Sequence, residues 1–169
     1  MKALLAVIAL LVVLGLGFLL YSSPPAPPEM TEAEIAQIEA EVAAVADQLM
    51  TAMNNLDTEV AAAYYDPSSM HGNDGAVYFA TYDEWVAHNE ELFGRFEELN
   101  AEWKNTRVDV LAPDVALFVG QNEVIAKQVS GAETNIQGYI TLVLRKIDNA
   151  WKIIHQASVG RWTPIEEGT

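Results

Sequence analysis

The spacing of the apolar residues changes once along this chain, near residue 100, and this change limits the folds that are open to it. Before residue 100, apolar residues recur every three to four positions, as they do on the buried side of an α-helix. After it, apolar and polar residues alternate, which is typical of strands with one buried face. Helices followed by consecutive strands indicate an α+β domain with an antiparallel sheet, and not a parallel α/β fold.

Three helices are predicted in the first half of the chain. Thr31 and Glu34 form a capping box at the start of the first helix, in which the hydroxyl and the carboxylate each bind a free backbone N–H. This helix should end near residues 54–55, and its buried stripe comprises Ile35, Ile38, Val42, Val45, Leu49 and Met53. Asp57 is the expected cap of a short second helix over residues 60–65. The third helix begins with a capping box at residues 81–84, and its buried side is predicted to carry Trp85, His88, Leu92, Phe96 and Leu99.

The second half predicts four strands, at residues 101–111, 115–129, 135–147 and 151–159. Short turns join them, so the strands form an antiparallel meander. Residues 67–80 are rich in turn-forming residues, and one short strand is expected there, at residues 76–79. We therefore expect three helices packed on a curved antiparallel sheet.

An uninterrupted apolar run, residues 3–21, precedes the domain, and Lys2 is the only charged residue before it. At about 1.5 Å per residue, a helix of this run is nearly long enough to cross a hydrocarbon core of roughly 30 Å. We expect a single-pass signal anchor with the domain outside the cytoplasm. The alternative is a cleaved signal peptide and a secreted or periplasmic domain. Residues 22–30 are then a proline-rich spacer, 31–162 the α+β domain and 163–169 a loose tail.

Composition excludes several classes of function. The chain has no cysteine, which rules out disulfides, thiol chemistry and cysteine metal sites. The formal net charge is −15, and without Lys2 the exported part carries −16. Such a charge repels phosphate backbones, so nucleic acid is not an expected partner. Cationic or neutral small molecules and basic protein surfaces are compatible with it.

Three segments together resemble the nuclear transport factor 2-like superfamily, particularly its SnoaL-like branch. They are residues 55–67 (NLDTEVAAAYYDP), residues 111–118 (LAPDVALF) and residues 150–158 (AWKIIHQAS), and the resemblance covers residues 31–160. It implies a cone-shaped fold with a pocket between the helices and the concave sheet, and often a dimer through the outer sheet face. It does not imply one activity, because members include ketosteroid isomerases, polyketide cyclases, dehydratases and non-catalytic binding or assembly domains.

His155 is the leading catalytic candidate. Strand alternation places Trp151, Ile153 and His155 on one mostly apolar face, which should point to the interior, and an imidazole there can exchange a proton near neutral pH. The alternative is a core histidine that is hydrogen-bonded to the backbone or to a carboxylate. Tyr64 and Tyr139 are candidates to donate to a carbonyl oxygen, as a tyrosine does in ketosteroid isomerases. The buried aspartate pair of those isomerases has no convincing match in this sequence.

Aromatic residues and one histidine are the candidates for the wall of an apolar pocket: Trp85, His88, Phe96, Trp103, Phe118 and Trp151. The same residues would also supply an ordinary core. No metal site is predicted, because the three histidines are far apart in sequence and no metal-binding spacing occurs. No cofactor is predicted either, since the sequence has no phosphate loop and no dinucleotide-binding motif.

Two functions from different classes remain open. The first is binding of a small apolar molecule without catalysis. The second is acid–base catalysis on an apolar carbonyl compound, as an isomerase, cyclase or dehydratase, so whether the protein is an enzyme stays undecided. A third reading, compatible with either, is a homodimeric assembly module whose outer sheet face carries Ile140, Leu142, Leu144 and Ile154.

Overall fold

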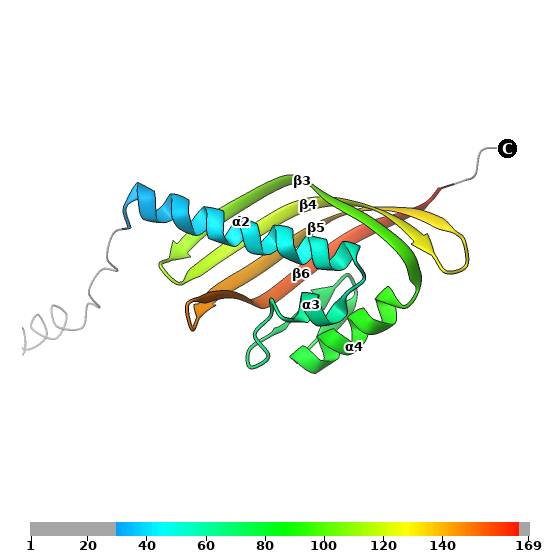
Figure 1. The fold of residues 1–169 in the computed structure, drawn as a ribbon, viewed down its shortest axis with the longest axis horizontal. Helices are drawn as coiled ribbons and strands as arrows, with labels where there is room; N and C mark the ends of the chain where they lie inside the picture. Colours follow the sequence, from blue (N-terminus) through cyan, green and yellow to red (C-terminus); the bar gives the residue numbers. More distant parts are fainter. Residues whose placement is uncertain (1–29, 166–169) are drawn as a thin grey trace, which may run out of the picture. The chain divides into compact units, whose positions relative to one another are not determined.

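The computed structural model describes residues 30–165, which form three helices and one six-stranded sheet. The helices are α2 (Glu32–Asn54), α3 (Thr58–Ala62) and α4 (Tyr82–Phe93). The strands are β1 (His71–Asp74), β2 (Val77–Phe79), β3 (Phe96–Ala112), β4 (Val115–Gln128), β5 (Glu133–Ile147) and β6 (Ala150–Pro164). The predicted α+β class is confirmed (Figure 1).

Some sequence predictions fall outside the described residues. They are those for the apolar run at residues 3–21, for the spacer up to residue 29 and for residues 166–169 of the tail. Within the described part of the chain, none of the helices has both the length and the apolar character needed to cross a bilayer. β6 continues to Pro164, so the strand includes the first two residues of the predicted tail.

The predicted caps fix where the helices begin. The Glu34 amide donates to the Thr31 hydroxyl at 3.2 Å, and the Thr31 amide donates to the Glu34 carboxylate at 2.8 Å, which completes the capping box of α2. Asp57 caps α3 by accepting from the Val60 amide at 2.9 Å. These side chains satisfy backbone groups that a helix start leaves unpaired.

The sheet has the order β2-β1-β6-β5-β4-β3. Strands β3 to β6 form the predicted antiparallel meander. β1 pairs in parallel with β6 and antiparallel with β2, so a segment from between the helices extends the sheet beside β6. Residues 71–74 form strand β1, which corrects the expectation of a turn-rich loop there.

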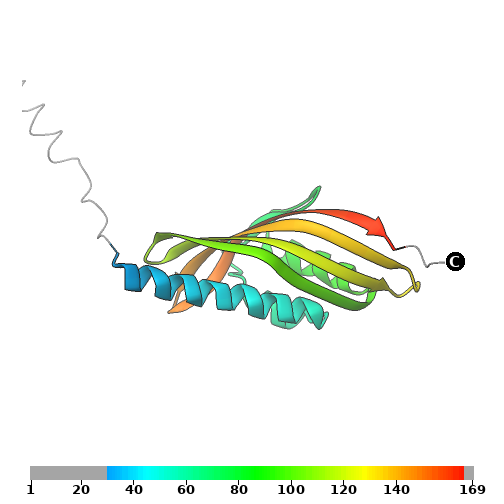
Figure 2. The same cartoon turned by 90° about the horizontal axis from the view of Figure 1, so that it is seen from above.

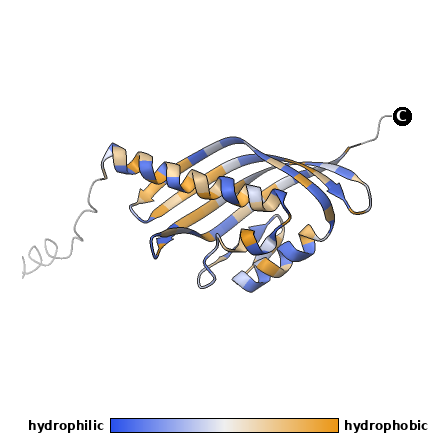
Figure 3. Cartoon of the chain, viewed as in Figure 1, coloured by the Kyte–Doolittle hydropathy of each residue, from blue (hydrophilic) through white to orange (hydrophobic). Residues whose placement is uncertain are grey.

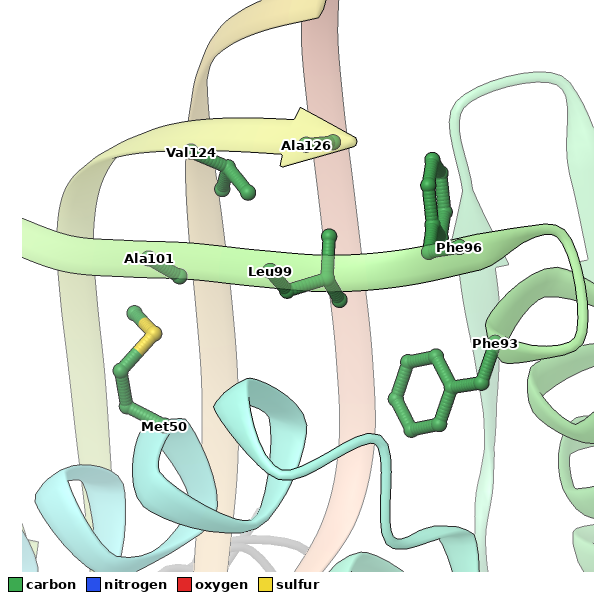
Figure 4. Close-up of a cluster of buried hydrophobic side chains, with 7 residues drawn as sticks. All are labelled: Met50, Phe93, Phe96, Leu99, Ala101, Val124 and Ala126. Carbon is green, nitrogen blue, oxygen red and sulfur yellow. The ribbon is translucent and has the colours of Figure 1, made fainter. Parts of the chain in front are cut away.

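Helix α2 covers one face of the curved sheet, called here the inner face (Figure 2). Figure 3 shows apolar residues concentrated in the strand segments beside this helix. Buried side chains of α2 include Val42, Ala46 and Leu49. One core cluster joins α2, α4, β3 and β4 (Figure 4), and consists of Met50, Phe93, Phe96, Leu99, Ala101, Val124 and Ala126.

Glu41 fastens the middle of α2 to the far end of the meander. Its carboxylate accepts from Lys146 Nζ at 2.9 Å and from Trp151 Nε1 at 2.8 Å. These bonds, with a further one from Gln37, lower the pKa of Glu41 to about 2. Trp151 therefore serves as a structural tie in this fold.

Over the described residues the sheet has four register shifts, three along β3 and one in β6, and two of them change the side chains expected on each face. In β3 the pairing slips between Phe96 and Glu98, so Phe96 and Leu99 both point to the inner face although they are three residues apart. A spacing of three resembles a helix, which is why the sequence analysis placed these two residues on the third helix. In the structure that helix ends at Phe93.

The second bulge lies in β6. Ile153 pairs with Leu144 and His155 pairs with Val143, so Ile154 is the extra residue. Cross-strand partners share a face, and Leu144 and Val143 point to opposite faces because they are consecutive. Ile153 and His155 therefore lie on opposite faces, where regular alternation would place them together.

The other sheet face, called here the outer face, carries half-buried and exposed side chains. By register and burial it includes Leu117, Val119, Tyr139, Thr141, Val143 and His155. The prediction that Ile140, Leu142 and Leu144 form this face is wrong. These three side chains are buried on the inner face, at 8%, 0% and 0% exposure.

Candidate functional site

A cavity of about 120 Å³ lies between the inner face of the sheet and helix α4. Most of its wall is apolar and is formed by Met53, Leu92, Phe93, Phe96, Leu99, Val124, Ile136, Ile140 and Trp162. Hollows of about 400 and 470 Å³ also occur, but they lie on the protein surface, where a ligand would remain largely in water. The smaller cavity is less open than these hollows and has the most apolar wall of the three, so it is the candidate site.

One side of the cavity is polar because β1 is paired with β6. This register sets Asp74 beside Ser158, and the Ser158 hydroxyl donates to Asp74 Oδ1 at 2.7 Å. From α4, His88 Nε2 lies 3.3 Å from Asp74 Oδ2. Asp74 and Ser158 both line the cavity. His88 contacts the Asp74 carboxylate without itself lining the cavity, and its ring packs against Phe79 with 5.0 Å between the centroids. The result is a fixed carboxylate at the cavity edge.

Two amide side chains add hydrogen-bonding groups to the wall. Asn89 Nδ2 donates to the Trp85 carbonyl at 2.8 Å, which leaves the amide oxygen of Asn89 as the atom available to a ligand. Asn122 lies on the sheet floor at 9% exposure, and its Oδ1 has no hydrogen-bond partner among the described residues. Buried polar atoms are normally paired, so Asn122 is a candidate to contact a ligand.

Gln156 completes the polar side. Its Oε1 accepts from the buried hydroxyl of Tyr65. Burial, and then the negative charge of Asp74, raise the pKa of Tyr65, so its hydroxyl stays protonated and can donate. Because the Tyr65 hydroxyl donates to the oxygen of the Gln156 amide, the amide nitrogen of this cavity-lining residue remains available as a donor.

Of the three predicted catalytic residues, Tyr139 is among the residues that line this cavity, and His155 and Tyr64 are not. The bulge at Ile154 puts His155 on the outer face, where its ring lies 4.8 Å from that of His71. Burial, followed by the neighbouring charge of His71, lowers the pKa of His155. Tyr139 borders the cavity but is 56% exposed, and its register with Gln121 assigns its side chain to the outer face. Tyr64 does not line the cavity.

Of the predicted ligand-binding residues, Phe96 lines the cavity and His88 contacts Asp74 at its edge. The others pack elsewhere. Trp85 packs against Tyr65 with tilted rings at 4.1 Å between ring centroids, and Trp103 packs against Phe118 at 5.1 Å. Together with Trp151, these residues serve the core.

Sequence reasoning missed Asp74, Gln156 and Ser158 as site residues. Asp74 was read as part of a loop, and strand alternation counted without the bulge assigned Gln156 and Ser158 to the face opposite the interior. Their register partners, Leu142 and Ile140, are buried apolar residues, but this pairing becomes visible only once the strands are aligned. Among residues 30–165, no group of three or more histidine, aspartate or glutamate side chains is arranged to hold a metal ion.

The sequence profile of the SnoaL-like domain family matches residues 42–161, and the chain belongs to this family. None of the curated proteins has a sequence that matches the chain. The family assignment agrees with the resemblance seen in the sequence.

Solved structures share the fold at low sequence identity. A type 2 hexachlorocyclohexane dehydrochlorinase, LinA, superposes with a TM-score of 0.71 at 12% identity, covering 80% of this chain and 94% of that one. A putative scytalone dehydratase from Novosphingobium aromaticivorans gives 0.73 at 13%, covering 82% and 94%. A putative calcium/calmodulin dependent protein kinase II association domain from Xanthomonas campestris gives 0.64 at 22%, covering 82% and 94%. These similarities establish the nuclear transport factor 2-like cone fold, whose members are often isomerases, dehydratases or ligand binders and often form dimers.

Proposed function

We propose that the protein binds a small, largely apolar molecule of about one ring in the cavity between α4 and the inner face. The observation that carries this proposal is the cavity itself, at about 120 Å³ and with an apolar wall and one polar side. An apolar cavity of roughly 150 Å³ is known to bind benzene, so a ligand of similar size is expected here. Larger ligands such as sterols would not fit without movement of α4.

Thermal unfolding of the full chain with toluene, benzyl alcohol and benzaldehyde tests this proposal. A ligand present at 100 times its dissociation constant should stabilise the folded state by about 2.7 kcal/mol. Ile136→Phe fills the cavity and should abolish the shift, because Ile136 lines it. Ile125→Phe is the matched control, since Ile125 is exposed on the outer side of β4. Equal shifts in both variants, or no shift in the wild type, would contradict the proposal.

A second function is favoured by one contact, that between Asp74 and His88. A carboxylate on a cavity wall, hydrogen-bonded to an imidazole 3.3 Å away, has the parts needed to remove a proton from a bound carbonyl compound. This assigns acid–base chemistry to residues other than His155, Tyr64 and Tyr139. LinA and the putative scytalone dehydratase are named for elimination reactions, which also begin with proton transfer in many mechanisms.

Exchange of the α-hydrogens of cyclohexanone with D₂O, followed by NMR, tests this function without knowledge of the natural substrate. The wild type should accelerate the exchange, and Asp74→Asn should abolish the acceleration because the base is lost. His155→Gln should keep the wild-type rate. If the wild-type protein does not exceed the rate in buffer, the acid–base function is rejected for this class of compound.

A further inference from the structure

The charges around the cavity are unbalanced. Among the described residues that line it, Asp74 is the one acidic residue, and none is a lysine or an arginine. No lysine or arginine of the described residues forms an ion pair with Asp74; Arg145 pairs with Asp66 and Lys146 with Glu41. The Asp74 carboxylate therefore lacks a strong cationic partner within the described part of the chain. The basic group that the structure sets against it is the His88 imidazole, whose Nε2 lies 3.3 Å from Oδ2.

The carboxylate is also held in place before any ligand arrives. The β1–β6 pairing fixes its backbone, and the Ser158 hydroxyl orients Oδ1 from 2.7 Å. Asn89, which follows His88 on α4, also lines the cavity, and its amide oxygen is a hydrogen-bond acceptor. A primary ammonium group has three donors and no acceptor, so a carboxylate and an amide oxygen are the partners it requires.

The remaining wall suits the rest of such a ligand. Phe96 and Trp162 line the cavity with their rings stacked at 6.1 Å between centroids, and Phe93 lies beside them. Aromatic faces attract cations as well as apolar groups. The formal net charge of −15 also draws cations toward the protein from a distance.

We infer that the cavity selects a small organic cation, namely a primary ammonium group on an apolar body of about one ring, with the ammonium at Asp74. This inference rests on the proposed binding function and adds the charge of the ligand to it. It changes the emphasis from the carbonyl compounds that the sequence suggests to cations, because the one acidic group on the polar side, Asp74, is a hydrogen-bond acceptor.

Isothermal titration of the full chain at neutral pH with three ligands of similar shape tests the inference: benzylamine, benzyl alcohol and benzoate. Benzylamine should bind roughly tenfold more tightly than benzyl alcohol, because a hydrogen bond between charged groups is about twice as strong as a neutral one. Benzoate should not bind measurably. Raised salt should reduce the advantage of benzylamine while leaving the affinity for benzyl alcohol unchanged.

Two variants, each with one aspartate replaced by asparagine, distinguish the effect of the Asp74 charge itself from the effect of the net charge of the protein. Asp74→Asn should remove the preference for benzylamine and retain binding of benzyl alcohol. Asp83→Asn changes the net charge equally but lies exposed in the first turn of α4, so it should keep the preference. If Asp74→Asn fails to fold, NMR contacts between the benzylamine methylene and Ser158 in the wild type replace it, and their absence would count against the inference.

The outcomes distinguish this inference from the proposed function. Benzyl alcohol that binds as tightly as benzylamine overturns the inference and leaves the binding function standing. No binding of any of the three ligands overturns both. An equal loss of preference in Asp74→Asn and Asp83→Asn overturns the assignment of the ammonium to Asp74.

Discussion

Asn54, the last residue of α2, joins this helix to the edge strand of the sheet. Its Nδ2 donates to the Ala101 carbonyl at 2.9 Å, and its Oδ1 accepts from the Ala101 amide at 2.7 Å. β3 is an edge strand, so one row of its backbone groups has no strand partner. The side chain of Asn54 therefore takes the place of a missing neighbour strand for one residue.

Asn54→Ala should lower the free energy of unfolding by about 1–3 kcal/mol, because it leaves two partly buried backbone groups without partners. Urea unfolding measures the change. Asn100→Ala is the control, since that side chain binds only the exposed Glu98, and it should change stability little. Equal effects of both substitutions would show that the Asn54 bonds contribute nothing specific.

His155 should make the fold sensitive to mild acid. Its pKa in the folded state is lowered, first by burial and then by the charge of His71, so the unfolded chain binds the proton more readily. Stability from this residue is therefore complete above the unfolded pKa of about 6.5 and decreases as the pH falls below it.

We expect the free energy of unfolding to fall between about pH 7 and pH 5 in the wild type, and to fall less in His155→Gln. Denaturant unfolding at several pH values measures this. Thr141→Ser, which changes a neighbouring outer-face position but keeps both histidines, should retain the wild-type slope. If the free energy of unfolding of His155→Gln falls with pH as steeply as that of the wild type, protonation of His155 is not the cause of the fall.

At the scale of elements, sequence patterns predicted most of the fold and little of the site. Capping residues and apolar periods located α2, the start of α4 and the four long strands, because these depend on interactions between residues near in sequence. The bulges in β3 and β6 and the β1–β6 pairing depend on partners 80 or more residues away or on one inserted residue, so the local pattern does not contain them. The polar side of the cavity depends on the last two of these features.

Gly72 should control whether β1 docks on β6 at all. A Cβ atom at this position would lie 2.0 Å from the Gln156 carbonyl oxygen, so Gly72→Ala must displace backbone. We expect a loss of about 3 kcal/mol or more, at the upper end for overpacked sites, together with faster amide hydrogen exchange over residues 71–79. Gly94→Ala should be tolerated, because its nearest contact is 3.3 Å and its φ is −60°. Protection of residues 71–79 in Gly72→Ala equal to that of the wild type would contradict this role.

At the scale of the whole molecule, we propose that the outer face pairs with a second copy of the chain. Leu117, Val119 and Val143 are apolar, only half-buried and not covered by a helix of the described residues. Proteins of this fold often form dimers. This proposal keeps the predicted homodimer and replaces the residues first assigned to it.

Val143→Asp should therefore shift the protein toward the monomer in multi-angle light scattering, because it buries a charge in the proposed interface. Val60→Asp is the matched control, since Val60 is 45% exposed on α3, away from the outer face. A wild-type protein that is monomeric at high concentration would reject the dimer.

The extra residue at Ile154 exchanges the two sheet faces for the positions of β6 that follow it. Upstream of it, odd-numbered positions such as 151 and 153 belong to the interior, and downstream the even-numbered positions 156 and 158 do. An alignment of related chains that ignores this extra residue would exchange inner-face positions for outer-face positions along the rest of the strand. A mutant library aimed at the cavity should therefore vary positions such as 156 and 158 of β6, because positions such as 155 lie on the outer face.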